Sequence, residues 1–386
     1  MGKSEKYAYL EAIRSRYREA SRESKTTILD EFCQVCGYNR KYAIRLLNRR
    51  RKKLKGRPGR KPFYGFPELL KALKRIWLTS DQMCSKKLVA AIPLWLPFYE
   101  SEISTEVTAK LLAISPATID RLLLPTRIKG RKKGLGGTKP GRLLRNQIPI
   151  RTDHWDITQP GFMEADTVAH CGNSLSGDFI WSLTLTDIHS GWTECRATWN
   201  NGAHGVIEQI KEIEKNLAFP LQGFDRDNGS EFSNHHLLRH FSKRVPKVKF
   251  TCSRPYKKND NAHVEQKNWS FVRHLLGYDR LDNPQLVELI NGLYSNEWSL
   301  YQNHFCPTFK LLEKKKIASK YKRKYEYPQT PYQRLVNSIH IAPEKKSELQ
   351  ACHQNLNPFI LKRKIEERLK EIFKLVKVTN NVRQRI

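Results

Sequence analysis

The chain has 386 residues, of which 39% are hydrophobic and 28% are charged. Single hydrophobic cores stop growing near about 250–300 residues, so this length predicts more than one domain, and the composition excludes a collagen-like chain or a low-complexity tract. Seventy Lys and Arg against 38 Asp and Glu give a formal net charge of +32. Such a surplus repels itself in a compact protein, so the composition predicts a polyanionic partner, above all nucleic acid.

A membrane surface is the other common polyanion, and the sequence argues against it. The most apolar stretch, residues 89–99, is interrupted by Pro93 and Pro97. It is shorter than the ~20 residues that span a bilayer. The first residues lack the apolar segment of a secretory signal, and scattered cysteines in a long basic chain fit reduced thiols. We therefore expect a cytoplasmic protein with no membrane partner.

The first 55 residues predict a helix-turn-helix DNA-binding module. Residues 28–36 form the first expected helix, Gly37 the turn and residues 39–47 the second helix. A small residue at the turn permits close helix contact, as this motif requires. The alternative is an ordinary helical hairpin with a solvated outer face. If the second helix reads DNA, its outward-facing side chains are Asn39, Arg40, Lys41 and Arg45.

A second helix-turn-helix module is predicted within residues 67–125. Residues 105–112 form a helix, and a second helix begins where Ser115 is a natural N-cap and Pro116 a natural first residue. Here Thr118 and Arg121 are the outward-facing candidates for DNA contact. Small or apolar residues recur at the same offsets in both modules, at Cys33, Gly37, Ala43 and Leu46 and at Ala109, Ala113, Ile119 and Leu122.

Basic segments follow both modules and mark the expected linkers. Residues 49–61 contain nine Lys or Arg and no acid, and residues 121–152 contain neither Asp nor Glu. Such segments are often only solvated, but their Gly and Pro content favours linkers at 56–66 and 126–154 that lie along phosphates. Arg57 and Arg60, in an Arg-Pro-Gly-Arg stretch, are candidates for minor-groove contact, with a plain linker as the alternative.

From residue 162 the pattern changes from helical to extended. Three β-branched and aromatic runs predict a meander of strands, after which helices and strands alternate. This order predicts a mixed α/β sheet with helices on its faces. The expected strands are 162–168, 179–186, 192–199, 221–224 and 248–252, and the expected helices are 204–217, 231–243 and 262–276.

Three acids stand on or at the ends of these elements. Asp166 lies in the first strand, Asp227 follows the fourth strand, and Glu265 lies early on the last helix. Carboxylates brought together by a sheet can hold two Mg²⁺ ions, which clamp the attacking and leaving oxygens of a phosphodiester displacement. Spacing alone leaves two choices open, because Glu164 shares a strand face with Asp166, and Asp225 stands in the same relation to Asp227.

These residues resemble a known constellation. Asp166, the sequence Asp-Asn-Gly-Ser-Glu-Phe at 227–232 and Glu265, 38 residues after Asp227, resemble the DDE triad of integrase-core transposases. These are bacterial insertion-sequence enzymes with a retroviral-integrase-like, RNase H-like catalytic domain. Residues 253–269 are similar to that family's approach to its last acid, and the resemblance covers about residues 155–300.

The resemblance implies a role for each acid. It favours Asp166 over Glu164 and Asp227 over Asp225, with Asp166 bridging two Mg²⁺ ions (Mn²⁺ able to substitute), Asp227 holding one and Glu265 the other. A metal-bound water would then cut the element end, and the freed 3′-hydroxyl would attack target DNA. Lys257 and Lys258, beside the last helix, would hold phosphates, a solvated loop being the alternative.

The sequence thus predicts a multidomain protein with all-α helix-turn-helix modules, an RNase H-like core at 155–300 and a basic, mainly helical region at 301–386. An amphipathic helix is expected at 365–376. By resemblance, the protein is a nucleoid-associated bacterial transposase that binds the terminal inverted repeats of its element and target DNA as a homo-oligomer in a synaptic complex. The alternatives are a catalytically silent, transposase-derived DNA-binding regulator and an RNase H-like nuclease without strand transfer.

Overall fold

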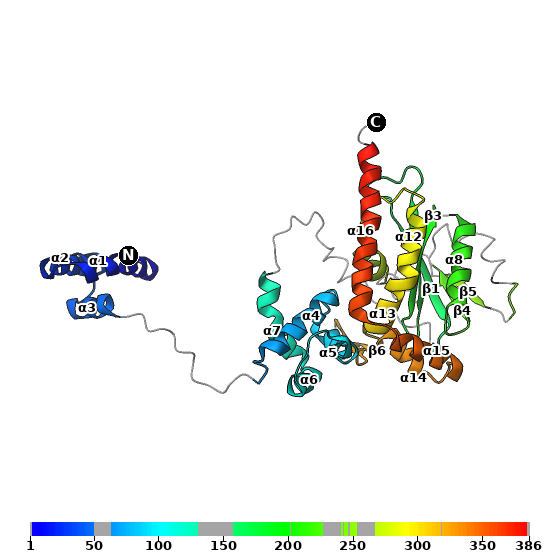
Figure 1. The fold of residues 1–386 in the computed structure, drawn as a ribbon, viewed down its shortest axis with the longest axis horizontal. Coiled ribbons are helices and arrows are strands. Elements are labelled where there is room, and N and C mark those ends of the chain that lie inside the picture. The colour runs from blue at the N-terminus through cyan, green and yellow to red at the C-terminus, as the bar shows by residue number, and fades with distance from the viewer. Residues whose placement is uncertain are drawn as a thin grey trace. The chain divides into compact units, whose positions relative to one another are not determined.

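The structure is a computed structural model of the whole chain. It describes residues 2–49, 63–129, 157–200, 202–226, 241, 243–245, 248–252, 267–317 and 319–383. The chain divides into two compact units, Met1–Phe63 and Tyr64–Ile386, each with its own core (Figure 1).

The first unit is a three-helix bundle of α1 (Lys3–Glu19), α2 (Arg22–Cys36) and α3 (Arg40–Asn48). The two predicted helices are confirmed. Gly37 ends α2 in the left-handed conformation with φ 64°, and the Asn39 side chain caps α3 by accepting a hydrogen bond from the Lys41 amide. Helix α1 was not predicted, although its buried residues, Leu10, Ile13 and Tyr17, recur at the helical spacing of three and four residues.

The second unit begins with the helices α4 (Pro67–Thr79), α5 (Ser85–Trp95), η1 (Leu96–Phe98), α6 (Thr105–Leu112) and α7 (Pro116–Lys129). The predicted helix at 105–112 and the helix start at Pro116 are confirmed. Of the small residues in the predicted spacing, Ala109 and Ala113 are exposed, so they do not form the helix contact expected of them. Leu111 and Ile114 are buried there instead.

Helices α4–α7 belong to one of the two hydrophobic cores of the second unit and share it with residues from the C-terminal half of the chain. The buried Trp95 at the end of α5 donates its indole N–H to the Phe305 carbonyl at 2.9 Å. Its ring makes edge-on contacts with Tyr301 and Phe359. The region predicted as a separate second module is therefore part of a larger packed unit.

A five-stranded sheet forms the centre of the second unit. Its strands are β1 (Phe162–Ala169), β2 (Ile180–Asp187), β3 (Thr193–Trp199), β4 (Gly223–Arg226) and β5 (Lys249–Cys252). The spatial order is β3-β2-β1-β4-β5. Strand β2 runs antiparallel to both of its neighbours, whereas β1, β4 and β5 are parallel. The predicted mixed α/β sheet is confirmed.

Each face of the sheet is covered by helices, and the strand alternation divides the side chains between them. Met163, Leu183 and Phe224 pack in one core with α8 (Ala203–Lys215). The opposite face meets a helical layer, so that α8 and α12 lie on opposite sides of the sheet in Figure 1. That layer consists of α12 (Leu286–Gly292), η4 (Leu293–Trp298), α13 (Ser299–Phe305) and α16 (Pro358–Arg383).

Strand β3 ends the sheet on one side, and two asparagine side chains pair with its backbone. The Asn303 amide accepts from the Thr193 N–H and donates to the Thr193 carbonyl, at 3.0 and 2.9 Å. The Asn291 amide does the same at Ala197, at 2.6 and 3.0 Å. Each amide takes the place of a neighbouring strand, so these backbone groups are satisfied although no strand follows.

The C-terminal region is helical in α14 (Pro331–Asn337), α15 (Pro343–Gln354) and α16. The predicted helix at 365–376 lies within α16, with Ile365, Ile372 and Val376 buried. Before these helices, β6 (Leu311–Ile317) and β7 (Lys320–Tyr325) form an antiparallel hairpin, so the region is less helical than predicted. In the described part of the chain, no helix is both long and apolar enough to cross a membrane.

Candidate active site

Asp166 lies in the middle of β1 and is half-buried. One carboxylate oxygen, Oδ1, accepts a hydrogen bond from the Thr167 amide at 2.7 Å. The other, Oδ2, accepts from the Asn268 side-chain amide at 2.5 Å. Because each oxygen is held by a separate donor, the carboxylate has a fixed orientation while part of it still reaches the surface.

The end of β4 lies beside Asp166. Strands β1 and β4 are parallel neighbours, with Glu164 opposite Asp225 and Ala165 opposite Arg226. Arg226 is the last residue of β4, and Asp227 follows it in the sequence. Asp227 itself lies outside the described residues. The structure therefore brings the strand that precedes the second predicted acid next to the first.

The helical segment that follows Glu265 in the sequence packs along β1. It comprises the π-helix η3 (Asn268–Arg273) and the short helix α11 (His274–Leu276). Asn268 binds Asp166, and Arg273 donates to the Ala169 carbonyl at 2.9 Å. Glu265 precedes Asn268 by three residues and lies outside the described residues. Thus β1, the end of β4 and the start of η3 meet at Asp166.

The neighbouring acids Glu164 and Asp225 differ from Asp166 in their burial. Glu164 is 1% exposed and Asp225 4% exposed, and Asp225 accepts a hydrogen bond from the Thr251 hydroxyl at 2.8 Å. Both acids lie below the surface that Asp166 reaches. Within the described ranges no group of three or more His, Cys, Asp or Glu side chains could hold a metal ion. Two of the three predicted ligands lie outside those ranges.

Lys267 is the first described residue after Glu265, and its side chain is buried. Its ammonium donates to the Gly191 carbonyl at 3.3 Å. Burial, followed by the nearby positive charges of Lys87 and Arg334, lowers the pKa of Lys267 to about 7. The side chain fixes the start of η3 to the loop before β3, away from solvent.

Asn268 is the residue of this site that sequence reasoning missed. Its amide nitrogen binds Asp166, while its buried Oδ1 has no hydrogen-bond partner in the part of the chain that the structure describes. A helical offset of three residues places two side chains on the same face. Asn268 follows Glu265 by three residues, so this spacing would have predicted Asn268 as a site residue if the contact of this helix with β1 had been known.

The candidate DNA contacts in α3 are exposed. Arg40, Lys41 and Arg45 all face solvent, with Arg40 paired to Asp30 of α2 and the Arg45 guanidinium 5.2 Å from the Tyr42 ring centroid. Asn39 is exposed as well, and its side chain also caps the helix by accepting from the Lys41 amide. These positions leave three cations of one short helix accessible to a ligand.

The candidates in α7 contact each other. Arg121 is exposed, and its guanidinium donates to the hydroxyl of the half-buried Thr118 at 3.1 Å. Thr118 also forms a hydrogen bond with the helix cap Ser115. The other four candidates, Arg57, Arg60, Lys257 and Lys258, lie outside the described residues.

Comparisons with known proteins give a relative that is similar over most of the chain. No model of a known protein family matches the sequence. The chain is 40% identical over 333 residues to the uncharacterized protein y4rM of Sinorhizobium fredii (strain NBRC 101917 / NGR234), a match that covers 84% of this chain and 93% of that protein. The chain belongs to the same family as y4rM, and the name of that relative states no activity.

A solved structure is also similar to part of the chain. It is the catalytic core domain of BIV integrase, with a TM-score of 0.31 and 17% sequence identity. The match covers 47% of this chain and 96% of that domain.

Proposed function

We propose that this protein is a DDE-type polynucleotidyl transferase, a transposase or integrase that cleaves element-end DNA and joins it to target DNA by direct transesterification. The observation that carries the proposal is the meeting of three segments at Asp166. The strand that bears the first acid, the strand that leads to Asp227 and the helix that follows Glu265 all converge there. If the register of β1 and β4 continued by one residue, Asp227 would lie opposite Asp166.

The donor atoms around Asp166 suit a hard divalent cation. Mg²⁺ prefers carboxylate and carbonyl oxygens. Asp166 offers a carboxylate that is partly accessible, and beside it lies the buried Asn268 Oδ1, which lacks a hydrogen-bond partner among the described residues. We propose that Asp166, Asp227 and Glu265 hold two Mg²⁺ ions or, in their place, Mn²⁺. Bound there, the ions would neutralise charge on the phosphodiester and activate the attacking oxygen.

The residues of the chain have separate tasks in this proposal. Asn268 and the Thr167 amide orient Asp166, and Arg273 fastens η3 to the end of β1, which keeps the helix in register with the strand. Glu164 and Asp225 support the sheet from below the surface. Arg40, Lys41, Arg45, Thr118 and Arg121 contact duplex DNA, together with Arg57, Arg60, Lys257 and Lys258. Two DNA ends must be held together for transfer, so we propose that the protein acts as a homo-oligomer.

The test uses purified full-length protein and duplex oligonucleotides from the DNA that flanks its gene. Asp166→Asn, Asp227→Asn and Glu265→Gln should each abolish Mg²⁺-dependent cleavage and strand transfer while DNA binding remains. Glu164→Gln is the matched control, since it replaces a carboxyl group two residues away on the same strand face, and the folded variant should retain activity. An active Asp166→Asn variant would overturn the assignment. Cleavage without joined products would indicate a nuclease instead.

A further inference from the structure

The hairpin of β6 and β7 is strongly basic and lies outside the site described above. Residues 311–325 contain seven Lys or Arg and one acid, Glu313. Every described side chain from 321 to 325 is exposed, including Tyr321 at 46% and Tyr325 at 47%. The single acid of the ribbon, Glu313, forms an ion pair with Lys315 at 2.6 Å. Because nearly all charges of the ribbon are positive, they repel one another and do not stabilise the hairpin.

The strand register places like charges directly opposite each other. Lys315 pairs with Lys322, and Lys314 pairs with Arg323. Like charges in opposed positions of an antiparallel pair destabilise it, and an isolated two-stranded hairpin is only marginally stable in water. The alternative is that these lysines only prevent aggregation of an exposed strand. Charges of both signs would serve that purpose, so it does not explain why nearly all of them are positive. A polyanion lying on the ribbon would turn the repulsion into favourable contacts.

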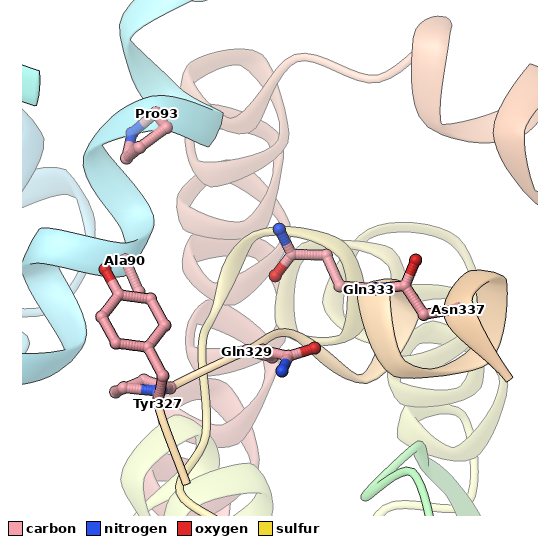
Figure 2. A pocket seen from close by; sticks show the side chains of 7 residues that line it. Ala90, Pro93, Tyr327, Gln329, Gln333 and Asn337 are labelled. Carbon is pink, nitrogen blue, oxygen red and sulfur yellow. The ribbon is translucent and has the colours of Figure 1, made fainter.

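The base of the hairpin is firmly attached to the second unit. Thr308 and Gln329 form a backbone bridge, and the guanidinium of Arg334, which is 8% exposed, donates to the Thr308 hydroxyl and carbonyl at 2.7 and 2.8 Å. A pocket of about 330 Å³ lies at this base. Its lining includes Tyr327, Gln329 and Gln333 together with Ala90 and Pro93 of α5 (Figure 2). The ribbon therefore projects from a fixed support.

We propose that the β6–β7 hairpin is a DNA-binding ribbon that lies in the major groove. The major groove is about 12 Å wide and admits a two-stranded β-ribbon. Strand β6 has seven residues. At ~3.4 Å per residue, a strand of that length spans about seven base pairs. Lys322 and Lys324 contact phosphates on one face, and Tyr321 and Arg323 lie on the other. This inference rests on the proposed DNA function and assigns it a surface beyond the helical modules.

The test compares two variants of the full chain with the same change in charge. One is Lys322→Gln with Arg323→Gln and Lys324→Gln. The control is Lys364→Gln with Lys370→Gln and Lys374→Gln, which removes three charges from the exposed side of α16. Binding to one duplex is measured by fluorescence anisotropy across a salt series. If the phosphate contacts of Lys322 and Lys324 are lost, the slope of log affinity against log salt should become shallower by about 1.8. The control should change it by less than one.

The outcomes separate this inference from the proposed function. Wild-type protein that fails to bind duplex DNA overturns both. Two results would overturn the ribbon alone while wild-type protein still binds DNA. One is a salt slope of the hairpin variant equal to that of the wild type. The other is a hairpin variant and a control variant whose salt slopes change by the same amount. A photocrosslinking amino acid in place of Tyr321 gives a second readout that does not depend on charge. We expect a covalent adduct with DNA; an adduct only with another protein chain would show that the ribbon is a protein-binding surface.

Discussion

The chain contains two helical regions with the same local pattern but different surroundings. Helices α2 and α3 belong to a small bundle with a core of its own, in which Phe32 and Leu47 are buried. Helices α6 and α7 resemble them in spacing, yet they belong to the core that also holds α13 and α16. Local sequence sets the helices and their caps in both regions. Residues far along the chain, such as Phe305 and Phe359, decide whether a region is a separate unit.

The largest effect is expected when one buried aromatic residue is removed from each region. Trp95→Ala should destabilise the second unit by about 3–5 kcal/mol, because both packing and the hydrogen bond to Phe305 are lost. Phe32→Ala should have a similar cost, enough to unfold a bundle of this size. Hydrogen exchange measured by mass spectrometry reports both regions in one protein. If Trp95→Ala exposed α1–α3 as well, the two units would not be independent.

The proposed recognition of DNA gives a second comparison of the two regions, because each contributes an exposed arginine. Arg45→Ala in α3 and Arg121→Ala in α7 should each reduce the preference for element ends over unrelated duplex by ~1–3 kcal/mol, the usual value of a base contact. Competition binding measures this preference. Lys52→Gln with Lys53→Gln and Lys55→Gln is the control, and it should weaken binding to every sequence equally. A loss seen only with Arg45→Ala would make the bundle the sole reader and α7 a packing helix.

Protonation of buried histidines at low pH should destabilise the second unit. The first unit should not show this effect, since residues 1–63 contain no histidine. Burial, with Arg273 nearby, lowers the pKa of His170 from 6.5 to about 3. The folded protein keeps this side chain neutral while the unfolded chain takes up a proton below pH ~6.5, so its contribution to stability falls as pH falls. Between pH 7 and pH 5 the loss is about 2 kcal/mol.

His170→Gln isolates this effect from the buried carboxyls Asp187 and Glu194, whose pKa values burial raises. The difference in unfolding free energy between wild type and variant should shrink by about 2 kcal/mol between pH 7 and pH 5. Urea denaturation at the two pH values measures it. A difference that does not change with pH would mean that His170 takes up its proton in the folded protein too.

The smallest test removes the two helix caps. Asn39 caps α3 and Ser115 caps α7, each by accepting a hydrogen bond from a backbone amide. Replacement of either residue by Ala should cost about 1 kcal/mol. In the bundle this cost should appear as faster exchange of all three helices, whereas in the second unit it should appear only as fraying at the start of α7. If loss of either cap accelerated hydrogen exchange to the same extent throughout its unit, the distinction between the two regions would be contradicted.

Much of this fold could be predicted from the sequence, because it depends on local patterns. The strands of the sheet alternate or run as β-branched segments, and Gly37, Asn39, Ser115 and Pro116 mark helix boundaries. The hairpin at 311–325 was missed because its lysines conceal the strand period. The contact of Asn268 with Asp166 joins residues 102 apart, and no local pattern encodes such a contact. Burial also separates Asp166 from Glu164, which spacing could not do.

The asparagine pairs on β3 limit how copies of this protein can assemble. A sheet often grows by accepting a strand from another molecule at its edge, but at Thr193 and Ala197 the required backbone groups are already bonded within the chain. The Cys195 carbonyl between them accepts from Arg196. Growth of the sheet past β3 would require α12 and α13 to detach. An oligomer of this protein is therefore expected to be joined through side-chain surfaces or through other parts of the backbone, because these groups of β3 are not available to pair with a strand of another molecule.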